Sequence, residues 1–317
     1  MATAVNEAPV RAPYLVIDGF LPGDVALAMR ADIDAHFAAP EAHRAETHQV
    51  WNYWYIPELY TYLRTTPEKV IDPRRVQRFF VALTDWSMRT LGMGFVTWPY
   101  LSLYVGGCRQ SIHNDSTNGR FGFVYSLTRD KRATIGGETL ILREGDPFRA
   151  NLTTPSAGRG FAESIAPVFN RLVVFDDRMP QAVECVEGSM DPVEGRFVLH
   201  GHIAENGLLV AGALSRAAVE DAVGATVAKF VAELTGRPER FHGPVVLRFT
   251  VRPDGNFGRG RILVDRVARG DGASAGAEAV SRELLSRIGA LRFLPAEGET
   301  EVTLPVAVGG PLPGRRA

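Results

Sequence analysis

The sequence contains few cysteines and no long apolar run. Of its 317 residues only Cys108 and Cys185 are cysteines. Two thiols are too few for a disulfide framework or a four-thiolate zinc site, so we expect a reducing compartment, the cytoplasm. No eighteen consecutive residues are apolar, and the start of the chain lacks a charged segment followed by a long apolar one. We therefore expect neither a membrane span nor a secretion signal.

Lysine is also scarce. Only Lys69, Lys131 and Lys229 occur, arginine supplies the rest of the positive charge, and the formal net charge is −1. This composition lacks the basic footprint of nucleic-acid binding proteins, so we expect no nucleic-acid partner. The hydrophobic fraction of 45% is sufficient for a sizeable core, and the length suggests about two domains.

The hydrophobic periodicity changes at about residue 205. Between Tyr100 and Ile203, short β-type runs alternate with turn residues, which is typical of a sandwich or barrel. The other expected elements are a strand at 14–21, helices at 22–39 and 72–92, a helical stripe at 219–231, a hairpin around Asp254 and Gly255, a helix at 277–291 and a last strand at 300–308. We predict an α+β protein with domains at residues 1–205 and 206–317.

His113 and Asp115 precede an alternating apolar run, "FGFVYSL". On a strand they would project to the same side, about 6 to 7 Å apart, which a metal ion can bridge. Tyr104 lies nine residues before His113. The stretch "GGETL" and a late strand that carries Arg196 follow in order.

This order of residues resembles the prolyl-hydroxylase-like branch of the 2-oxoglutarate- and Fe(II)-dependent oxygenases, over roughly residues 12–205. The resemblance implies a double-stranded β-helix, or jelly-roll barrel, with packing helices. It further implies that His113 and Asp115 hold Fe(II), that Arg196 binds the distal carboxylate of 2-oxoglutarate, and that Tyr104 lines the same pocket. Two imidazoles and one carboxylate leave positions open for the keto acid and for O2. The planar guanidinium of an arginine suits a carboxylate.

The sequence departs from the family pattern at the third metal ligand. Gln181 stands where the family has a histidine, and an amide oxygen is a poorer ligand for Fe(II) than imidazole. Either the position was substituted to trap a complex, or a natural glutamine is the ligand, or the domain has lost its redox chemistry. A displaced histidine is a further alternative, because His200 and His202 share the strand parity of Arg196.

An aromatic segment, "HQVWNYWYIPELYTYLR", and the neighbours of the metal pair supply candidates for substrate contact. The aromatic side chains either pack against the barrel or form a wall of the substrate pocket. The candidates are Trp51, Asn52 and Trp54, with His48 as a further polar side chain, and Asn114 and Thr117 beside the metal pair.

Residues of about 214–311 resemble the C-terminal domain of TonB-type transducers. The shared pattern is a strand, a "PDG" turn, a second strand, a helix, an "RF-x-P" step and a final strand. The resemblance implies an accessory module that contacts a protein partner or a second copy through an exposed sheet edge.

The resemblance to the oxygenases implies a dioxygenase that uses Fe(II), 2-oxoglutarate and O2 to hydroxylate a peptide, protein or small-molecule substrate. The alternative is a binding or scaffold protein that keeps the pocket without turnover. Gln181 favours this alternative, whereas His113, Asp115 and Arg196 favour the enzyme.

Overall fold

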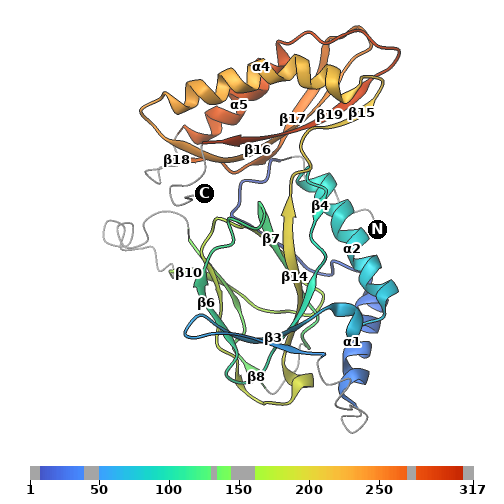
Figure 1. Ribbon diagram of the computed structural model, residues 1–317, viewed down its shortest axis with the longest axis vertical. Coiled ribbons are helices and arrows are strands. Elements are labelled where there is room, and N and C mark those ends of the chain that lie inside the picture. The colour runs from blue at the N-terminus through green and yellow to red at the C-terminus, as the bar shows by residue number, and fades with distance from the viewer. Residues whose placement is uncertain (1–7, 39–49, 130–133, 144–160, 270–275, 310–317) are drawn as a thin grey trace. The chain divides into compact units, whose positions relative to one another are not determined.

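The computed structural model describes residues 8–38, 50–129, 134–143, 161–269 and 276–309 (Figure 1). The chain divides into two compact units. The barrel unit comprises Pro13–Asp85 and Phe95–Ala204. The C-terminal unit comprises Met1–Ala12, Trp86–Gly94 and Glu205–Ala317, so it includes two short segments from the first part of the chain.

The barrel unit contains a curled, antiparallel sheet, which Figure 1 shows wrapping around an interior. Its main strand order is β1-β11-β7-β14-β5-β3-β6-β12-β9-β10, with β2 paired to β3 and β4 paired to β14. The strands are β1 (Tyr14–Ile17), β2 (Asn52–Ile56), β3 (Tyr60–Thr65), β4 (Phe95–Val96), β5 (Tyr100–Tyr104), β6 (Arg109–His113), β7 (Phe121–Ser126), β9 (Thr139–Leu142), β10 (Ala162–Ile165), β11 (Leu172–Asp176), β12 (Gln181–Val183) and β14 (Arg196–Ala204). A separate two-stranded ladder joins β8 (Thr134–Ile135) and β13 (Glu187–Gly188).

Eight of these strands form two groups of four neighbours, β11-β7-β14-β5 and β6-β12-β9-β10. Successive strands along the chain mostly alternate between the two groups. Because the sheet is curled, side chains on the inner face of both groups point toward a common interior. The predicted β-type runs between Tyr100 and Ile203 therefore do form one curled sheet.

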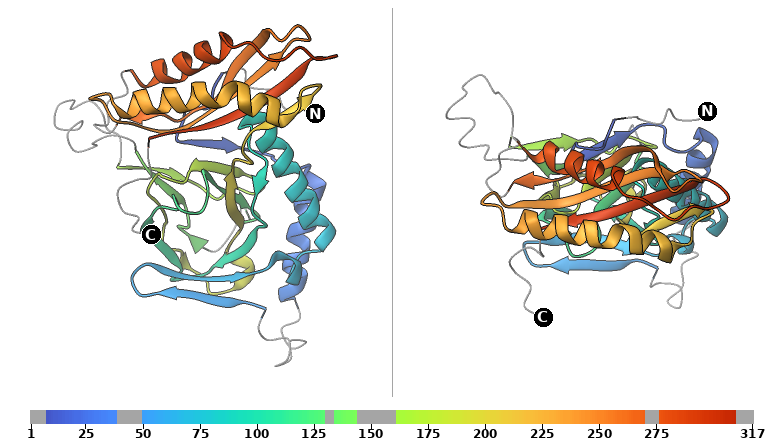
Figure 2. Two further views of the ribbon diagram at one scale, coloured as in Figure 1. Left: turned by 45° about the horizontal axis from the view of Figure 1, so that its top comes forward. Right: turned by 90° about the horizontal axis from the view of Figure 1, so that it is seen from above.

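Two helices pack against the outside of the curled sheet, α1 (Gly23–Phe37) and α2 (Pro73–Thr90), and they lie side by side in Figures 1 and 2. Val76, Phe79 and Leu83 of α2 are fully buried at helical spacing. The Phe79 ring lies 4.8 Å from the Tyr125 ring of β7, measured between centroids. Both predicted helices are therefore confirmed as packing helices. Two 3₁₀ turns, η3 (Pro67–Lys69) and η5 (Pro192–Glu194), complete the unit.

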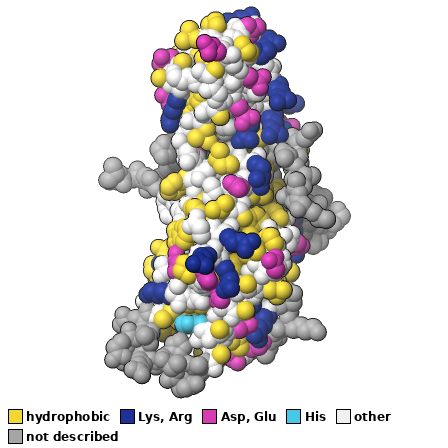
Figure 3. Space-filling view, turned by 90° about the vertical axis from the view of Figure 1, so that its right-hand side faces the viewer, with side chains coloured by type: hydrophobic (Ala, Val, Ile, Leu, Met, Phe, Trp, Pro, Cys, Tyr) yellow, Lys and Arg dark blue, Asp and Glu magenta, His cyan; other side chains and the backbone are white. Residues whose placement is uncertain are grey.

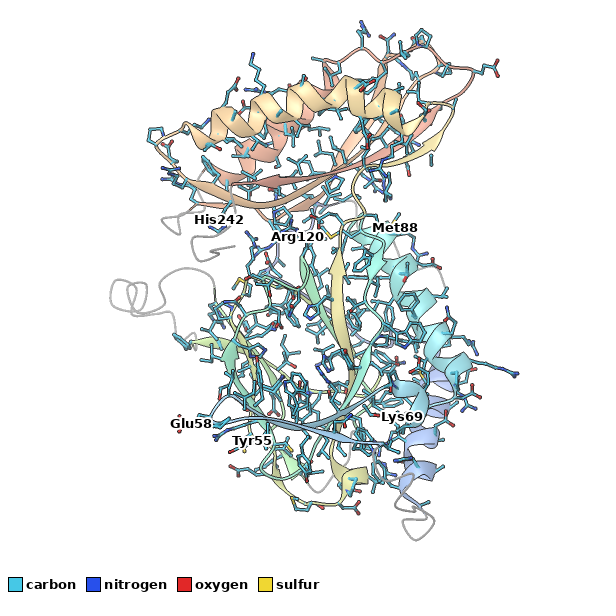
Figure 4. The ribbon with its side chains drawn as sticks, in the orientation of Figure 1. Tyr55, Glu58, Lys69, Met88, Arg120 and His242 are labelled. Atoms are coloured by element: carbon cyan, nitrogen blue, oxygen red, sulfur yellow. The ribbon has the colours of Figure 1, made fainter. Side chains whose placement is uncertain are left out.

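The aromatic segment before residue 66 forms a hairpin that sequence analysis did not predict. Strands β2 and β3 pair in register from Asn52↔Arg64 to Ile56↔Tyr60. Tyr55 on β2 and Glu58 in the turn mark this hairpin in Figure 4. The aromatic residues on both sides of Pro57 were the available signal.

The C-terminal unit is a small sheet with two helices on one face (Figure 2). Its strand order is β15-β19-β16-β17, and β18 pairs with the start of β16. The elements are β15 (Leu209–Gly212), α4 (Arg216–Thr235), β16 (Phe241–Val251), β17 (Phe257–Asp265), β18 (Ala268–Arg269), α5 (Ala277–Gly289) and β19 (Thr300–Val308). Phe230 of α4, Leu284 of α5 and Phe249 of β16 lie in one buried cluster.

The hairpin around Asp254 and Gly255 is confirmed. Gly255 has a φ of +76°, and a Cβ atom there would lie 2.2 Å from the carbonyl oxygen of Phe293. Only glycine fits this turn, because both the conformation and the close approach exclude a side chain. The edge strand β15, by contrast, was not predicted.

The segment Trp86–Gly94 packs within the C-terminal unit. A Cβ atom on Gly92 would lie within 2.9 Å of side-chain atoms of Val246, Leu263 and Thr303. The Arg248 guanidinium donates a hydrogen bond to the Met88 carbonyl oxygen at 2.7 Å. The end of α2 and the residues that follow it therefore pack within the C-terminal unit.

Two surface properties of the described residues are their hydropathy and their charge distribution. In the described part of the chain, no helix combines the length and apolarity that a membrane crossing requires. On the face shown in Figure 3, basic and acidic side chains are interspersed rather than gathered by sign.

Candidate active site

The register between β6 and β12 brings three of the predicted site residues together. His113, the last residue of β6, pairs with Gln181, the first residue of β12. Asp115 lies in the turn after β6 rather than on the strand. Its Oδ2 lies 3.8 Å from Nε2 of His113 and accepts a hydrogen bond from Nε2 of Gln181 at 2.6 Å.

A bulge in β6 aims His113 inward. Gln181 pairs with His113, whereas Val183 pairs with Gln110, so β6 has one more residue than β12 over this stretch. In a regular strand Gln110 and His113, three apart, would face opposite sides. Because of the bulge, both line the same cavity.

The His113 ring is held with one nitrogen directed at Asp115. Nδ1 lies 2.7 Å from the carbonyl oxygen of Ser111, which can only accept a hydrogen bond. Nδ1 therefore carries the proton, and the lone pair of Nε2 remains available for a metal ion. The Tyr60 ring packs edge-on against the imidazole at 5.1 Å between centroids.

Gln181 offers a buried oxygen. Its side chain is 5% exposed, and Oε1 has no hydrogen-bond partner among the described residues. The second carboxylate oxygen of Asp115, Oδ1, accepts from the Asn118 amide at 3.1 Å. A buried oxygen without a donor is costly, and a cation at this point would satisfy it.

These side chains line a cavity of about 260 Å³ inside the barrel unit. Natural ligand pockets of roughly 300–1,000 Å³ hold drug-sized molecules, so this cavity suits small ones. Its lining includes Trp54, Tyr60, Tyr62, Arg64, Tyr104, Gln110, His113, Asp115, Thr139, Gln181, Arg196, Val198, His200 and His202. The predicted residues Arg196 and Tyr104 therefore share one cavity with the candidate metal ligands.

Arg196 and Tyr104 are register partners on β14 and β5. Arg196 is 1% exposed, and its guanidinium donates to Oγ1 of Thr139 at 3.1 Å. The guanidinium carbon lies 4.7 Å from the centre of the Tyr104 ring. A Cβ atom on Gly137, which has a φ of +78°, would lie 3.0 Å from Cδ of Arg196. The predicted double glycine thus leaves room for the arginine stem.

Burial raises the pKa of Tyr104 well above its usual range, although Arg196 acts in the opposite direction. The phenol is therefore protonated, and it donates to Oε1 of Gln110 at 3.0 Å. It presents a neutral hydroxyl beside the buried cation.

A second set of donors shares Asp115. One ligand atom each from Asp115, Asp177 and His202 lie within 4.8 Å of one another. Nδ1 of His202 lies 3.0 Å from Oδ2 of Asp177. Burial raises the pKa of Asp177 to about 6, although His202 acts to lower it. Of the two histidines considered as displaced ligands, His202 therefore lies in a possible donor set.

His200 has a different environment. Its Nε2 lies 2.8 Å from Oγ of Ser102, and burial, followed by the nearby Arg64, lowers its pKa to about 3. It is a neutral, hydrogen-bonded group on the cavity wall.

The candidates for substrate contact separate into two groups. Trp54 lines the cavity, whereas Trp51, Asn52, Asn114 and Thr117 are absent from its lining. Trp51 donates to Nε2 of His36 at 3.1 Å, and its ring stacks on Phe37. For Trp51, the expected alternative of packing within the fold therefore holds, rather than a place in the cavity wall. His48 lies outside the described residues.

Sequence analysis missed the inward side of β3. Tyr60, Tyr62 and Arg64 all line the cavity. Their period of two in "YTYLR" was the signal, because alternate residues of a strand share one face.

No protein-family model matches the sequence, and no curated protein matches it significantly. Solved structures similar to this chain include a prolyl-4-hydroxylase from Pseudomonas putida, at 17% identity and a TM-score of 0.44, covering 61% of this chain and 93% of that chain. A prolyl hydroxylase from Trichoplax adhaerens, in complex with a hypoxia inducible factor oxygen degradation domain peptide, has 12% identity and a TM-score of 0.42, covering 59% and 81%. The non-heme alpha ketoglutarate dependent epimerase SnoN from nogalamycin biosynthesis has 11% identity and a TM-score of 0.41, covering 61% and 77%. At such low TM-scores, function has to be argued from the side chains of this chain.

Proposed function

We propose that this protein is an Fe(II)- and 2-oxoglutarate-dependent oxygenase that hydroxylates a C–H bond of a peptide, protein or small-molecule substrate. The observation that carries the proposal is one cavity that joins a His113, Asp115 and Gln181 donor set to the buried Arg196 guanidinium. The alternation of eight strands between two groups supports a double-stranded β-helix as the scaffold.

The side chains present fit a divalent metal ion. His113 would contribute Nε2, Asp115 a carboxylate oxygen, and Gln181 the buried Oε1 that has no partner among the described residues. Three protein donors on one side leave adjacent positions open, as in other non-haem iron oxygenases. The amide oxygen is the weakest of the three donors, so we expect lower iron affinity than with two histidines.

Arg196 suits the distal carboxylate of 2-oxoglutarate. A buried guanidinium forms strong, charge-assisted hydrogen bonds with a carboxylate, and removal from water increases their strength. Thr139 and Tyr104 fix its position on two sides. The Thr139 hydroxyl, which accepts from the Arg196 guanidinium, can take part in binding the same carboxylate.

Bound iron would supply the redox chemistry in which O2 converts 2-oxoglutarate to succinate and carbon dioxide while the substrate is hydroxylated. The protein side chains orient the reactants. Asp115 would offset part of the metal charge, the Ser111 carbonyl oxygen orients the His113 ring through Nδ1 so that Nε2 is the donor atom, and the aromatic wall of Tyr60 and Tyr62 restricts water around the reacting C–H bond.

The C-terminal unit completes the proposal as an accessory module that resembles the C-terminal domain of TonB-type transducers. Its order of strand, Gly255 turn, strand, helix and final strand supports this interpretation. We expect it to contact a protein partner or a second copy of the chain rather than to catalyse.

A non-catalytic binding protein is the second candidate. Gln181 favours it, because Nε2 of Gln181 occupies Oδ2 of Asp115 with a hydrogen bond that a metal ion would have to replace.

Anaerobic calorimetry with Fe(II), with and without 2-oxoglutarate, followed by a succinate assay in air, tests the proposal. We expect 2-oxoglutarate to bind more tightly when Fe(II) is present, and succinate to form. Binding of both without succinate, across a panel of acids and peptides, supports the binding protein. Absence of Fe(II) and of 2-oxoglutarate binding overturns both candidates.

A further inference from the structure

Arg64 lies between two aromatic rings on the wall of the cavity. Its guanidinium carbon is 3.8 Å from the centre of the Trp54 ring and 4.1 Å from that of the Tyr100 ring. Trp54 is 38% exposed and Tyr100 is 43% exposed, so the rings hold the cation on the solvent side of the cavity. Such cation–π contacts stabilise an arginine without neutralising its charge.

Among the described residues, Arg64 lacks the carboxylate partner that several other arginines of the barrel unit have. Arg30, Arg75, Arg129, Arg171 and Arg178 each form an ion pair with an aspartate or glutamate. Among the described residues, no carboxylate forms an ion pair with Arg64. The cavity wall also carries Arg196, and Asp115 is the one carboxylate in its described lining.

The geometry of the rings determines what Arg64 can still bind. With aromatic rings over the guanidinium, the N–H groups along its edge remain for other partners. A planar carboxylate matches this edge with two parallel hydrogen bonds. Because the rings restrict the side chain before binding, less conformational entropy is lost on association.

Tyr62 adds a neutral donor beside Arg64 on the same strand. Burial raises the pKa of Tyr62 to about 12, although Arg64 acts to lower it. The hydroxyl is therefore protonated near neutral pH. It can donate to an anion held at Arg64.

We propose that Arg64, held by Trp54 and Tyr100, binds a carboxylate of the substrate, so that the hydroxylated molecule is a carboxylic acid. The inference rests on the proposed function, in which Arg196 would bind one carboxylate of 2-oxoglutarate and the metal donor set would take the other. The charge of Arg64 then remains for the second reactant.

Binding of benzoate and benzamide, measured by calorimetry on the full chain without metal, tests the site. The Arg196→Gln variant is the starting protein, because it removes the other cation of the cavity. We expect it to prefer benzoate over benzamide, and the added Arg64→Gln change to reduce benzoate affinity at least tenfold. Arg109→Gln, an exposed arginine on β6, is the matched control and should change nothing.

A thermal unfolding scan and the tryptophan fluorescence of each variant show whether the hairpin remains folded. Arg64→Lys provides a second variant that keeps the charge but loses the planar edge, and we expect intermediate benzoate affinity. Equal benzoate affinity with and without Arg64 in folded protein overturns the inference.

Turnover separates this inference from the proposed function. N-acetyl amino acids and their amides are compared as stimulants of succinate release by the Fe(II)-loaded wild-type protein. We expect the acids to be preferred at least tenfold through KM, and the preference to disappear in Arg64→Gln. If amides stimulate as well as acids, the carboxylate inference fails and the oxygenase stands. If nothing yields succinate, the oxygenase fails, and benzoate binding still decides whether Arg64 holds carboxylates.

Discussion

Replacement of Gln181 by histidine is the most direct test of the metal site. In the structure, Gln181 donates to Asp115 at 2.6 Å, and its buried Oε1 has no partner among the described residues. Without a metal ion this unsatisfied oxygen costs roughly 1–3 kcal/mol. Imidazole is a far better donor to Fe(II) than an amide oxygen, and position 181 already contacts Asp115.

We therefore expect Gln181→His to raise Fe(II) affinity at least tenfold, which corresponds to about 1.4 kcal/mol. Succinate formation should rise with it. Anaerobic calorimetry at one fixed pH gives the affinity, and Mn(II) provides a redox-stable check. Gln77→His, which places an imidazole on the exposed side of α2, controls for weak binding by an added histidine.

Variants of the other histidines decide between donor sets. If Gln181→His leaves Fe(II) affinity unchanged while His202→Gln abolishes it, the metal is held by Asp115, Asp177 and His202, and our assignment of Gln181 is refuted. A loss with His200→Gln instead would place the third ligand on the opposite wall.

Three further outcomes follow from buried groups and packing. Arg196→Gln should weaken 2-oxoglutarate binding by about 2–4 kcal/mol in calorimetry, because a carboxylate loses its buried partner. The control Arg216→Gln, on the exposed start of α4, should not weaken it. Equal weakening by both variants would remove Arg196 from the site. The pKa of His200 is lowered to about 3, below its usual 6.5, so the unfolded chain takes up a proton first and stability falls as the pH drops from about 6.5 toward 3. Between pH 7 and pH 4, the free energy of unfolding measured with urea should fall by up to about 3 kcal/mol less in His200→Gln than in wild type. Equal falls in the two proteins would contradict the buried, neutral imidazole. Truncation after Ala204 removes Val246 and Leu263, which pack around Gly92. The Tm of the truncated protein, measured by scanning calorimetry, should therefore lie about 5 °C or more below that of the full chain. An unchanged Tm would mean that this packing contributes nothing to stability.

Local patterns predicted the elements well where one periodicity dominated. Val76, Phe79 and Leu83 mark α2 because three residues at helical spacing must face one side, and all three are buried. Asp254 and Gly255 mark the β16–β17 hairpin because its turn requires a positive φ. The β2–β3 hairpin was missed because β2 is exposed throughout, so its sequence shows no alternation between apolar and polar residues.

Part of the cavity lining was predictable from the sequence, and its geometry less so. His113, Asp115, Gln181, Tyr104 and Arg196 do line one cavity. Their partners depend on contacts between distant segments, such as Asp177 with His202, which no local pattern specifies. Arg64 escaped notice for the same reason, since its significance comes from Trp54 on one neighbouring strand and Tyr100 on another.

The bulge in β6 makes backbone pairing, and not residue identity alone, decide which side chains reach the cavity. Ile112 lies on the outer side, 54% exposed, within the extra length that separates Gln110 from His113. Deletion of Ile112 would bring the histidine to two positions after Gln110, so a regular strand would still place both side chains on the cavity side. If β6 kept its length and the bulge were lost, for example through one added residue in β12, Gln110 and His113 would face opposite sides and one of them would leave the cavity.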